Sequence, residues 1–190
     1  MTEIFIQHPD PWVGIPEHFP VPHRWATASE WASELVAVLA ERLAEPTPEQ
    51  RESIVTFLVA VAEGRESRLA SRTYVVVTGW DDPVHIVDMA IVPHHVLAGL
   101  SIEEFAGAYD QSTIEKPYVE PFVSDTGVPG IRCVRYTNSE KLGGLIARSD
   151  FVFAVPEGLL RFYTTTVNLV AFEQVQPLLA DLARSVSVVA

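Results

Sequence analysis

Apolar residues recur at helical spacing in two neighbouring stretches early in the chain. Before the first stretch, Thr27 and Glu30 form the S/T-x-x-E pattern of a capping box. Before the second, Thr47 precedes Pro48 and Gln50, a capping box with proline at the first helical position. The inward stripes are Trp31, Leu35, Val38, Leu39 and Leu43 in the first stretch, and Ile54, Phe57, Leu58 and Val61 in the second. We expect two helices, the second ending at Gly64, that pack as an αα-hairpin.

Two more helices are predicted further along the chain. Ser101 and Glu104 form another capping box at the start of the third helix. The inward residues are Ile102, Phe105 and Tyr109 in the third helix, and Phe172, Val175, Leu179 and Leu182 in the fourth. Pro177 lacks a backbone donor, so we expect it within the first two turns of the fourth helix or at a kink.

Segments rich in β-branched and aromatic residues predict strands between turn signals. These segments are residues 73–78, 84–92, 131–136, 151–155, 159–166 and 186–189. Pro156-Glu157-Gly158 predicts one hairpin turn, and Trp80-Asp81-Asp82-Pro83 predicts another. Short connections between strands favour antiparallel pairing. The chain is therefore expected to have an α+β fold, with a mainly antiparallel sheet flanked by four helices.

The first 26 residues differ from the rest because they are rich in proline. Pro9, Pro11, Pro16, Pro20 and Pro22 alternate with the large rings of Trp12, Phe19 and Trp25. Proline fixes φ and removes a donor, so this segment is neither a helix nor a central strand. We expect an extended arm, residues 1–26, packed on a single α+β domain that spans residues 1–190. A docking segment for a partner is the alternative interpretation of the arm.

The end of the chain carries a resemblance to a known fold. The segment DFVFAVPEGLLRFYTTTVNLVAFEQVQPLLADLARSVSVV resembles the ending of the PsbP-like, Mog-type α/β fold. That resemblance implies an antiparallel sheet flanked by helices, in which the last helix returns the chain to a final strand. Most members of that fold are non-enzymatic binding or assembly proteins, so the resemblance implies an interaction role.

The charge balance excludes several classes of partner. The chain has 25 acidic and 13 basic residues, and a formal net charge of −12. Nucleic acids and anionic membranes are bound through clustered lysines and arginines, so we expect neither as a partner. One cysteine, Cys133, permits no internal disulfide, and the first residues lack the charged and apolar regions of a signal peptide. We therefore expect a cytoplasmic protein.

A few residues are candidates for binding chemistry. The tryptophan and two acids of Trp80-Asp81-Asp82 are suited to anchoring a basic partner, although covering the end of the sheet is the simpler role. His94-His95 follows a predicted strand, and His85 lies on that strand. Metal sites need three or four converging ligands, so we expect no metal here, and we expect no cofactor. On the arm, Trp12 and Phe19 are further candidates for partner contact.

Two functions remain open at this point. The first is a non-catalytic acidic interaction or adaptor protein that docks a protein partner through a sheet face, the Trp80 loop or the arm. The second is a small-molecule-binding protein or enzyme with a pocket lined by histidines and acids, drawing on His85, His94, His95 or Cys133. No catalytic motif such as G-x-S-x-G is present, which favours the first. A homodimer is compatible with either function.

Overall fold

The computed structural model describes residues 3–64, 70–141 and 143–189. The chain divides into two compact units, of which the larger comprises Met1–Asp10 with Val87–Ala190 and the smaller comprises Pro11–Ile86. Four helices within these ranges and mainly antiparallel strand pairing confirm the α+β class. Because the expected single domain rests on how the two units are joined, it stays a prediction.

An antiparallel sheet forms the centre of the larger unit. Its neighbouring strands are β4 (His85–Pro93, which belongs to this unit from Val87 on), β8 (Gly158–Thr166), β7 (Gly144–Val155), β6 (Pro129–Ser139) and β5 (Tyr118–Val123), in this order. The predicted hairpin turn joins β7 to β8, where Val155 pairs with Gly158. A Cβ at Gly158 would overlap the carbonyl oxygen of Val92 on β4, so only glycine fits where β8 begins beside β4.

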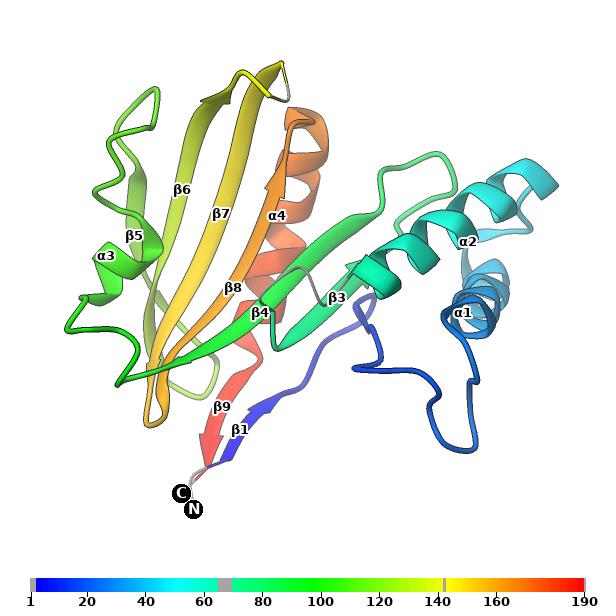
Figure 1. The fold of residues 1–190 in the computed structure, drawn as a ribbon, viewed down its shortest axis with the longest axis horizontal. Coiled ribbons are helices and arrows are strands. Elements are labelled where there is room, and N and C mark those ends of the chain that lie inside the picture. Colours follow the sequence, from blue (N-terminus) through cyan, green and yellow to red (C-terminus); the bar gives the residue numbers. More distant parts are fainter. Residues whose placement is uncertain (1–2, 65–69, 142, 190) are drawn as a thin grey trace. The chain divides into compact units, whose positions relative to one another are not determined.

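The two ends of the chain form a separate ladder. Strand β1 (Glu3–Ile6) pairs antiparallel with β9 (Val186–Val189) in a two-stranded sheet, and Figure 1 shows them side by side next to the termini. The sequence predicted a strand at residues 186–189, and among the described residues this strand pairs with β1 and not with the larger sheet.

Two helices cover opposite faces of the larger sheet. Phe172 of α4 (Leu169–Arg184) packs with Val134, and Ala106 of α3 (Ile102–Ala106) packs with Cys133. Neighbouring residues of a strand point to opposite faces, so the two helices lie on opposite sides of β6. The predicted stripe of α4 is buried, and Pro177 lies inside the helix, in its third turn.

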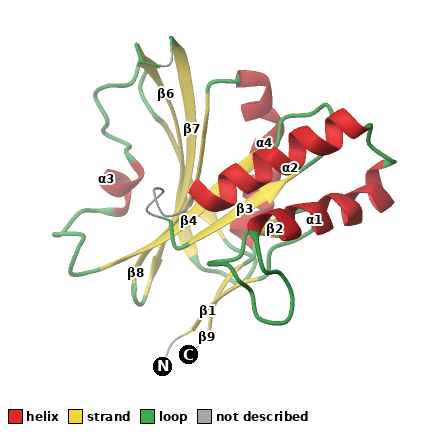
Figure 2. Ribbon diagram, turned by 45° about the vertical axis from the view of Figure 1, so that its right-hand side comes forward, coloured by secondary structure: helices red, strands yellow, loops and turns green. Residues whose placement is uncertain are grey.

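The smaller unit contains the predicted helical pair. Helices α1 (Ala28–Leu43) and α2 (Pro48–Glu63) lie side by side (Figure 2), beside the short ladder of β2 (Val13–Gly14) and β3 (Arg72–Val76). Thr47 and Gln50 form the predicted capping box. At α1, Thr27 accepts from the backbone of Glu30, whereas the Glu30 carboxylate accepts from the backbone of Ala26. The bond from the backbone to Glu30 therefore comes from Ala26, one residue before the Thr27 position that a capping box predicts.

Three residues expected on inward stripes are exposed. Val38 and Phe57 are 49% and 40% exposed. In α1 the buried face also includes Ala32 and Val36, and Val38 falls outside it. In α2 the buried face is too narrow to include Phe57. Tyr109 is 68% exposed, because α3 ends at Gly107 before the chain completes another turn. These side chains add apolar area to the surface rather than to the core.

The proline-rich residues of the smaller unit are partly built into its core. Trp12 is 2% exposed, and Phe19 and Trp25 pack against the cluster that contains Trp31. The backbone is not uniformly extended, since Val21 and Trp25 form an antiparallel bridge. An extended arm packed on the domain therefore stays a prediction, although its rings contribute to a hydrophobic core.

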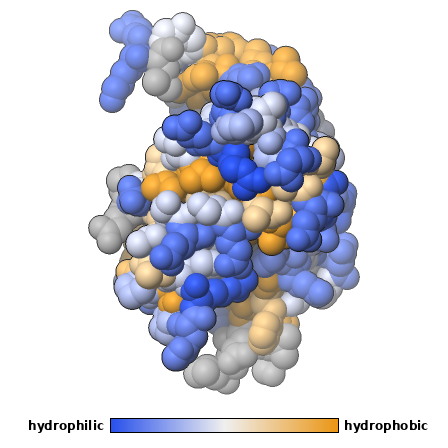
Figure 3. Space-filling view, turned by 90° about the vertical axis from the view of Figure 1, so that its right-hand side faces the viewer, coloured by the Kyte–Doolittle hydropathy of each residue, from blue (hydrophilic) through white to orange (hydrophobic). Residues whose placement is uncertain are grey.

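The surface is mixed in character. On the face seen in Figure 3, hydrophobic atoms form separate areas between predominantly hydrophilic ones. None of the helices in the described part of the chain is both long and apolar enough to cross a membrane.

Candidate functional site

The register of three strands brings charged residues together on the α3 side of the larger sheet. Arg135 on β6 lies opposite Arg148 on β7, and Arg148 lies opposite Thr165 on β8. Two positions further along β7 is Asp150, which by the alternation of side chains shares the face of Arg148. Arg161 on β8 lies opposite Val152 of the same face. One sheet surface therefore carries three arginines around one aspartate.

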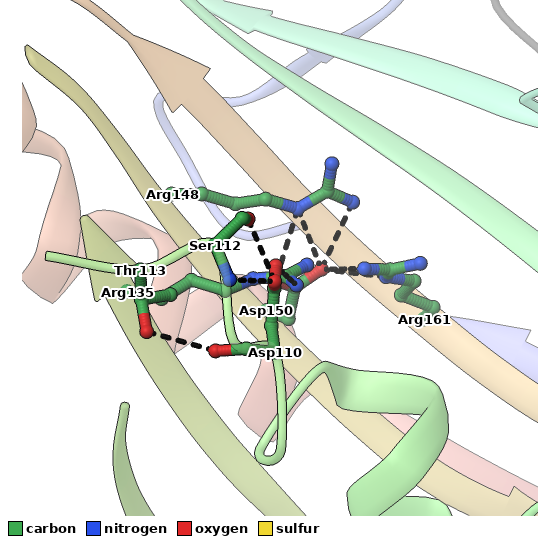
Figure 4. Close-up of polar contacts among 7 residues, drawn as sticks. All are labelled: Asp110, Ser112, Thr113, Arg135, Arg148, Asp150 and Arg161. Atoms are coloured by element: carbon green, nitrogen blue, oxygen red, sulfur yellow. Dashed lines mark hydrogen bonds and ion pairs between the residues drawn. The ribbon is translucent and has the colours of Figure 1, made fainter. Parts of the chain in front are cut away.

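The Asp150 carboxylate is the centre of this cluster. Its side chain is fully buried, at 0% exposure. Arg148 Nε lies 3.0 Å from Oδ2, Arg135 Nη2 lies 3.2 Å from Oδ2, and Arg161 Nε lies 2.5 Å from Oδ1. Figure 4 shows the three guanidinium groups converging on this carboxylate from three neighbouring strands. Charge-assisted contacts of this kind fix both the carboxylate and the arginines.

Aromatic rings lie beside two of the arginines. The Arg161 guanidinium lies 5.1 Å from the ring centre of Phe105 and 5.2 Å from that of Tyr163, and Arg148 lies 4.5 Å from Tyr163. Burial lowers the pKa of Arg161, while the charge of Asp150 acts in the opposite direction. The positive charge of this cluster is therefore held in a poorly solvated position.

The loop after α3 holds Arg135 from the other side. Asp110 Oδ2 lies 3.1 Å from Arg135 Nη1, and its Oδ1 accepts hydrogen bonds from the hydroxyl and backbone N–H of Ser112. These bonds from Ser112 are the main cause of the lowered pKa of Asp110, with a smaller contribution from Arg135. Gly107 has φ +80°, and a Cβ there would overlap the Arg135 guanidinium. Glycine at the end of α3 therefore allows the loop to close over Arg135.

An open pocket borders this cluster. Its volume is about 410 Å³, and all but one of its lining residues are of polar or charged type: Asp110, Ser112, Arg135, Thr137, Asn138, Ser139, Ile146, Arg148 and Thr165. We call it the arginine pocket. Arg148 is the more accessible of its two arginines, with 28% of the side chain exposed against 12% for Arg135. The arrangement is suited to hydrogen bonding and charge recognition.

The Trp80 loop is engaged in contacts within the smaller unit. The Trp80 indole N–H donates to the carbonyl oxygen of Ala44 at 2.8 Å, and its ring packs against the core. Asp81 Oδ1 accepts from the Gln50 side chain at 2.8 Å, and Asp82 Oδ2 accepts from the Thr78 hydroxyl at 3.1 Å. These contacts explain the positions of Trp80, Asp81 and Asp82 by a structural role.

The remaining sequence candidates have different surroundings within their own units. His94 and His95 are exposed on the turn after β4, where the His94 backbone N–H donates to the carbonyl oxygen of Glu157. Trp12 is buried and Phe19 is partly buried in the smaller unit. Cys133 is fully buried beneath α3, and burial raises the pKa of its thiol. Across the described ranges, no three histidines, cysteines or acids come close enough to bind a metal ion.

His85 gives a prediction about pH. It is 5% exposed, no hydrogen bond to its Nε2 is found among the described residues, and burial lowers its pKa below 6.5. Below about pH 6.5 the unfolded chain therefore binds a proton at this histidine more readily than the folded chain does. The stability that depends on neutral His85 is complete above that pH and is lost as the pH falls. We expect the unfolding temperature of wild type to drop more between pH 7 and pH 5 than that of His85→Gln.

Tryptophan fluorescence is the appropriate measurement, because all four tryptophans and His85 belong to the smaller unit. The matched control is His94→Gln, which changes an exposed histidine and should keep the pH dependence of wild type. Identical pH profiles for wild type and His85→Gln would contradict the prediction.

Sequence reasoning missed the arginine cluster. The predicted strand began at residue 151, whereas β7 begins at Gly144 and includes Arg148 and Asp150. One signal was available, because Arg148 and Asp150, like Arg161 and Tyr163, are spaced by two residues and share a strand face. The sequence does not show that three strands bring these pairs together.

No protein-family model and no curated protein matches this chain.

Proposed function

We propose that this protein is a non-catalytic interaction protein that docks a protein partner through the sheet face bearing the arginine pocket. The observation that supports this proposal is the convergence of Arg135, Arg148 and Arg161 on Asp150 beside an open polar pocket. Arginine is enriched at protein interfaces because its planar guanidinium makes several directed hydrogen bonds. The cytoplasm is the proposed location, in keeping with the single cysteine.

The other docking surfaces expected from the sequence are less suitable. The side chains of Trp80, Asp81 and Asp82 are bonded within their own unit, so a partner would have to compete with these contacts. Trp12 is buried, so it has little surface to offer. The arginine pocket, by contrast, is open and has exposed residues such as Thr165 at its wall.

The test is recovery of a partner from the native host with wild type and two matched variants. Thr165→Arg adds bulk and charge at the pocket wall, and Thr56→Arg makes the same change on an exposed position of α2. We expect a stoichiometric partner with wild type and Thr56→Arg, and at least a tenfold loss with Thr165→Arg, which corresponds to about 1.4 kcal/mol. Absence of a stoichiometric partner, or equal recovery with Thr165→Arg, would overturn the proposal.

A further inference from the structure

We infer that the arginine pocket binds a single carboxylate, supplied by an acidic residue of the protein partner. The inference rests on the proposed function for the source of the carboxylate, but the pocket's chemistry can be tested alone. Three observations carry it: the local charge, the cross-strand arrangement of the arginines, and the polar lining of the pocket.

The charges at the pocket do not cancel. Arg135, Arg148 and Asp110 line it, and directly beneath them Asp150 contacts Arg161. Among the described residues that line the pocket, two cations and one anion leave one positive charge, in a chain whose formal net charge is −12. Asp88 on β4 lies opposite Tyr163 and does not line the pocket. One further carboxylate would bring the net charge of the pocket to zero, whereas a dianionic phosphate would make it negative.

The arrangement of the arginines also favours an anion between them. Arg135 and Arg148 are direct cross-strand partners, and like charges in that position destabilise a sheet. The Asp150 carboxylate on β7 offsets the repulsion between these two arginines through its contacts with Arg135 Nη2 and Arg148 Nε. Among the described residues, Arg148 contacts Asp150 through Nε and Nη2 and lies over the Tyr163 ring, and no hydrogen bond from its Nη1 is found there. This nitrogen is suited to bind a carboxylate from outside.

The remaining lining fits the same ligand. Thr137 and Thr165 supply hydroxyl groups. These groups donate to a carboxylate without adding charge. The described lining residues include no lysine, so recognition by them depends on the directed donors of arginine. A glutamate or aspartate side chain is a ligand of the appropriate size and charge for this volume.

The test uses two short peptides and the full chain. N-acetyl-Gly-Glu-Gly-amide and its glutamine counterpart differ only in the carboxylate, and NMR titration follows the backbone signals of residues 135–139, 146–148 and 165. We expect saturable shifts with the glutamate peptide, weakening as salt rises, and none with the glutamine peptide. Equal shifts with both peptides, or tighter binding of inorganic phosphate than of the glutamate peptide, would overturn the inference.

Three variants keep the test independent of folding defects. Arg148→Gln should weaken binding of the glutamate peptide at least about tenfold, the effect of losing one charge-assisted hydrogen bond. Thr165→Glu removes no arginine and places a carboxylate opposite Arg148, so it should abolish peptide binding, whereas Thr165→Gln should retain it. Unchanged affinity in Thr165→Glu would count against the site.

The outcomes separate this inference from the proposed function. Peptide binding without a recoverable partner would support the carboxylate site and reject the docking role. A partner that is lost with Thr165→Arg, from a protein that ignores the glutamate peptide, would support docking and reject the carboxylate site.

Discussion

Replacing Asp150 with asparagine is expected to lower the free energy of unfolding of the larger unit by about 3–5 kcal/mol. The substitution removes the charge of a fully buried carboxylate that contacts Arg135, Arg148 and Arg161. The three guanidinium groups, 12–28% exposed, would then remain in a poorly solvated position without their shared counter-charge. Breaking a buried ion pair from one side is costly for this reason.

The measurement must report on the larger unit. All four tryptophans lie in the smaller unit, so their fluorescence does not follow the cluster directly. Urea denaturation followed by circular dichroism, with amide hydrogen exchange of β6, β7 and β8, gives the required signal.

Asp181→Asn is the matched control for Asp150→Asn. Asp181 also pairs with an arginine, Arg184 at 2.7 Å, but its side chain is 57% exposed. Exposed pairs contribute about 0.2–1 kcal/mol, so this variant should remain close to wild type. If Asp150→Asn were no more destabilising than Asp181→Asn, the cluster would not depend on its central carboxylate.

The helices could be predicted from the sequence because their signals are local. Thr47, Pro48 and Gln50 specify the start of α2 within four residues, and Ser101 with Glu104 specifies α3. Their ends were less predictable: Gly107 adopts a left-handed conformation that ends α3 after one turn, and this leaves Tyr109 exposed. Local sequence signals therefore predicted where the helices begin more accurately than where they end.

Strand lengths were underestimated where polar residues continue a strand. Arg148 and Asp150 extend β7 ahead of its apolar run, because the partners of these charges are on neighbouring strands. Strand β5 was missed because Glu120 and Pro121 interrupt its apolar residues, as is tolerated at a sheet edge. The candidate site combines β6, β7, β8 and the loop after α3, so it depends on tertiary register that no local pattern encodes.

Replacing Trp12 with alanine is expected to destabilise the smaller unit by about 3–5 kcal/mol, the usual cost of removing a large buried ring. Trp12 is 2% exposed, although it lies among prolines that would equally suit a docking peptide. A large loss of stability is expected of a structural segment and not of a free ligand-like arm. Fluorescence of the three remaining tryptophans during urea denaturation measures the change in the correct unit.

Trp25→Ala provides the comparison, because Trp25 belongs to the same proline-rich segment but is only partly buried. Its indole N–H donates to Glu34 at 2.7 Å, and the Arg24 guanidinium lies 3.9 Å from its ring centre, both near the surface. Removing this ring exposes less new apolar surface, so its cost should be the smaller of the two. If Trp12→Ala cost no more than Trp25→Ala, or left stability unchanged, the segment would have to be reinterpreted as a docking element. A clear difference in the expected direction would mean that its rings serve first to complete the core.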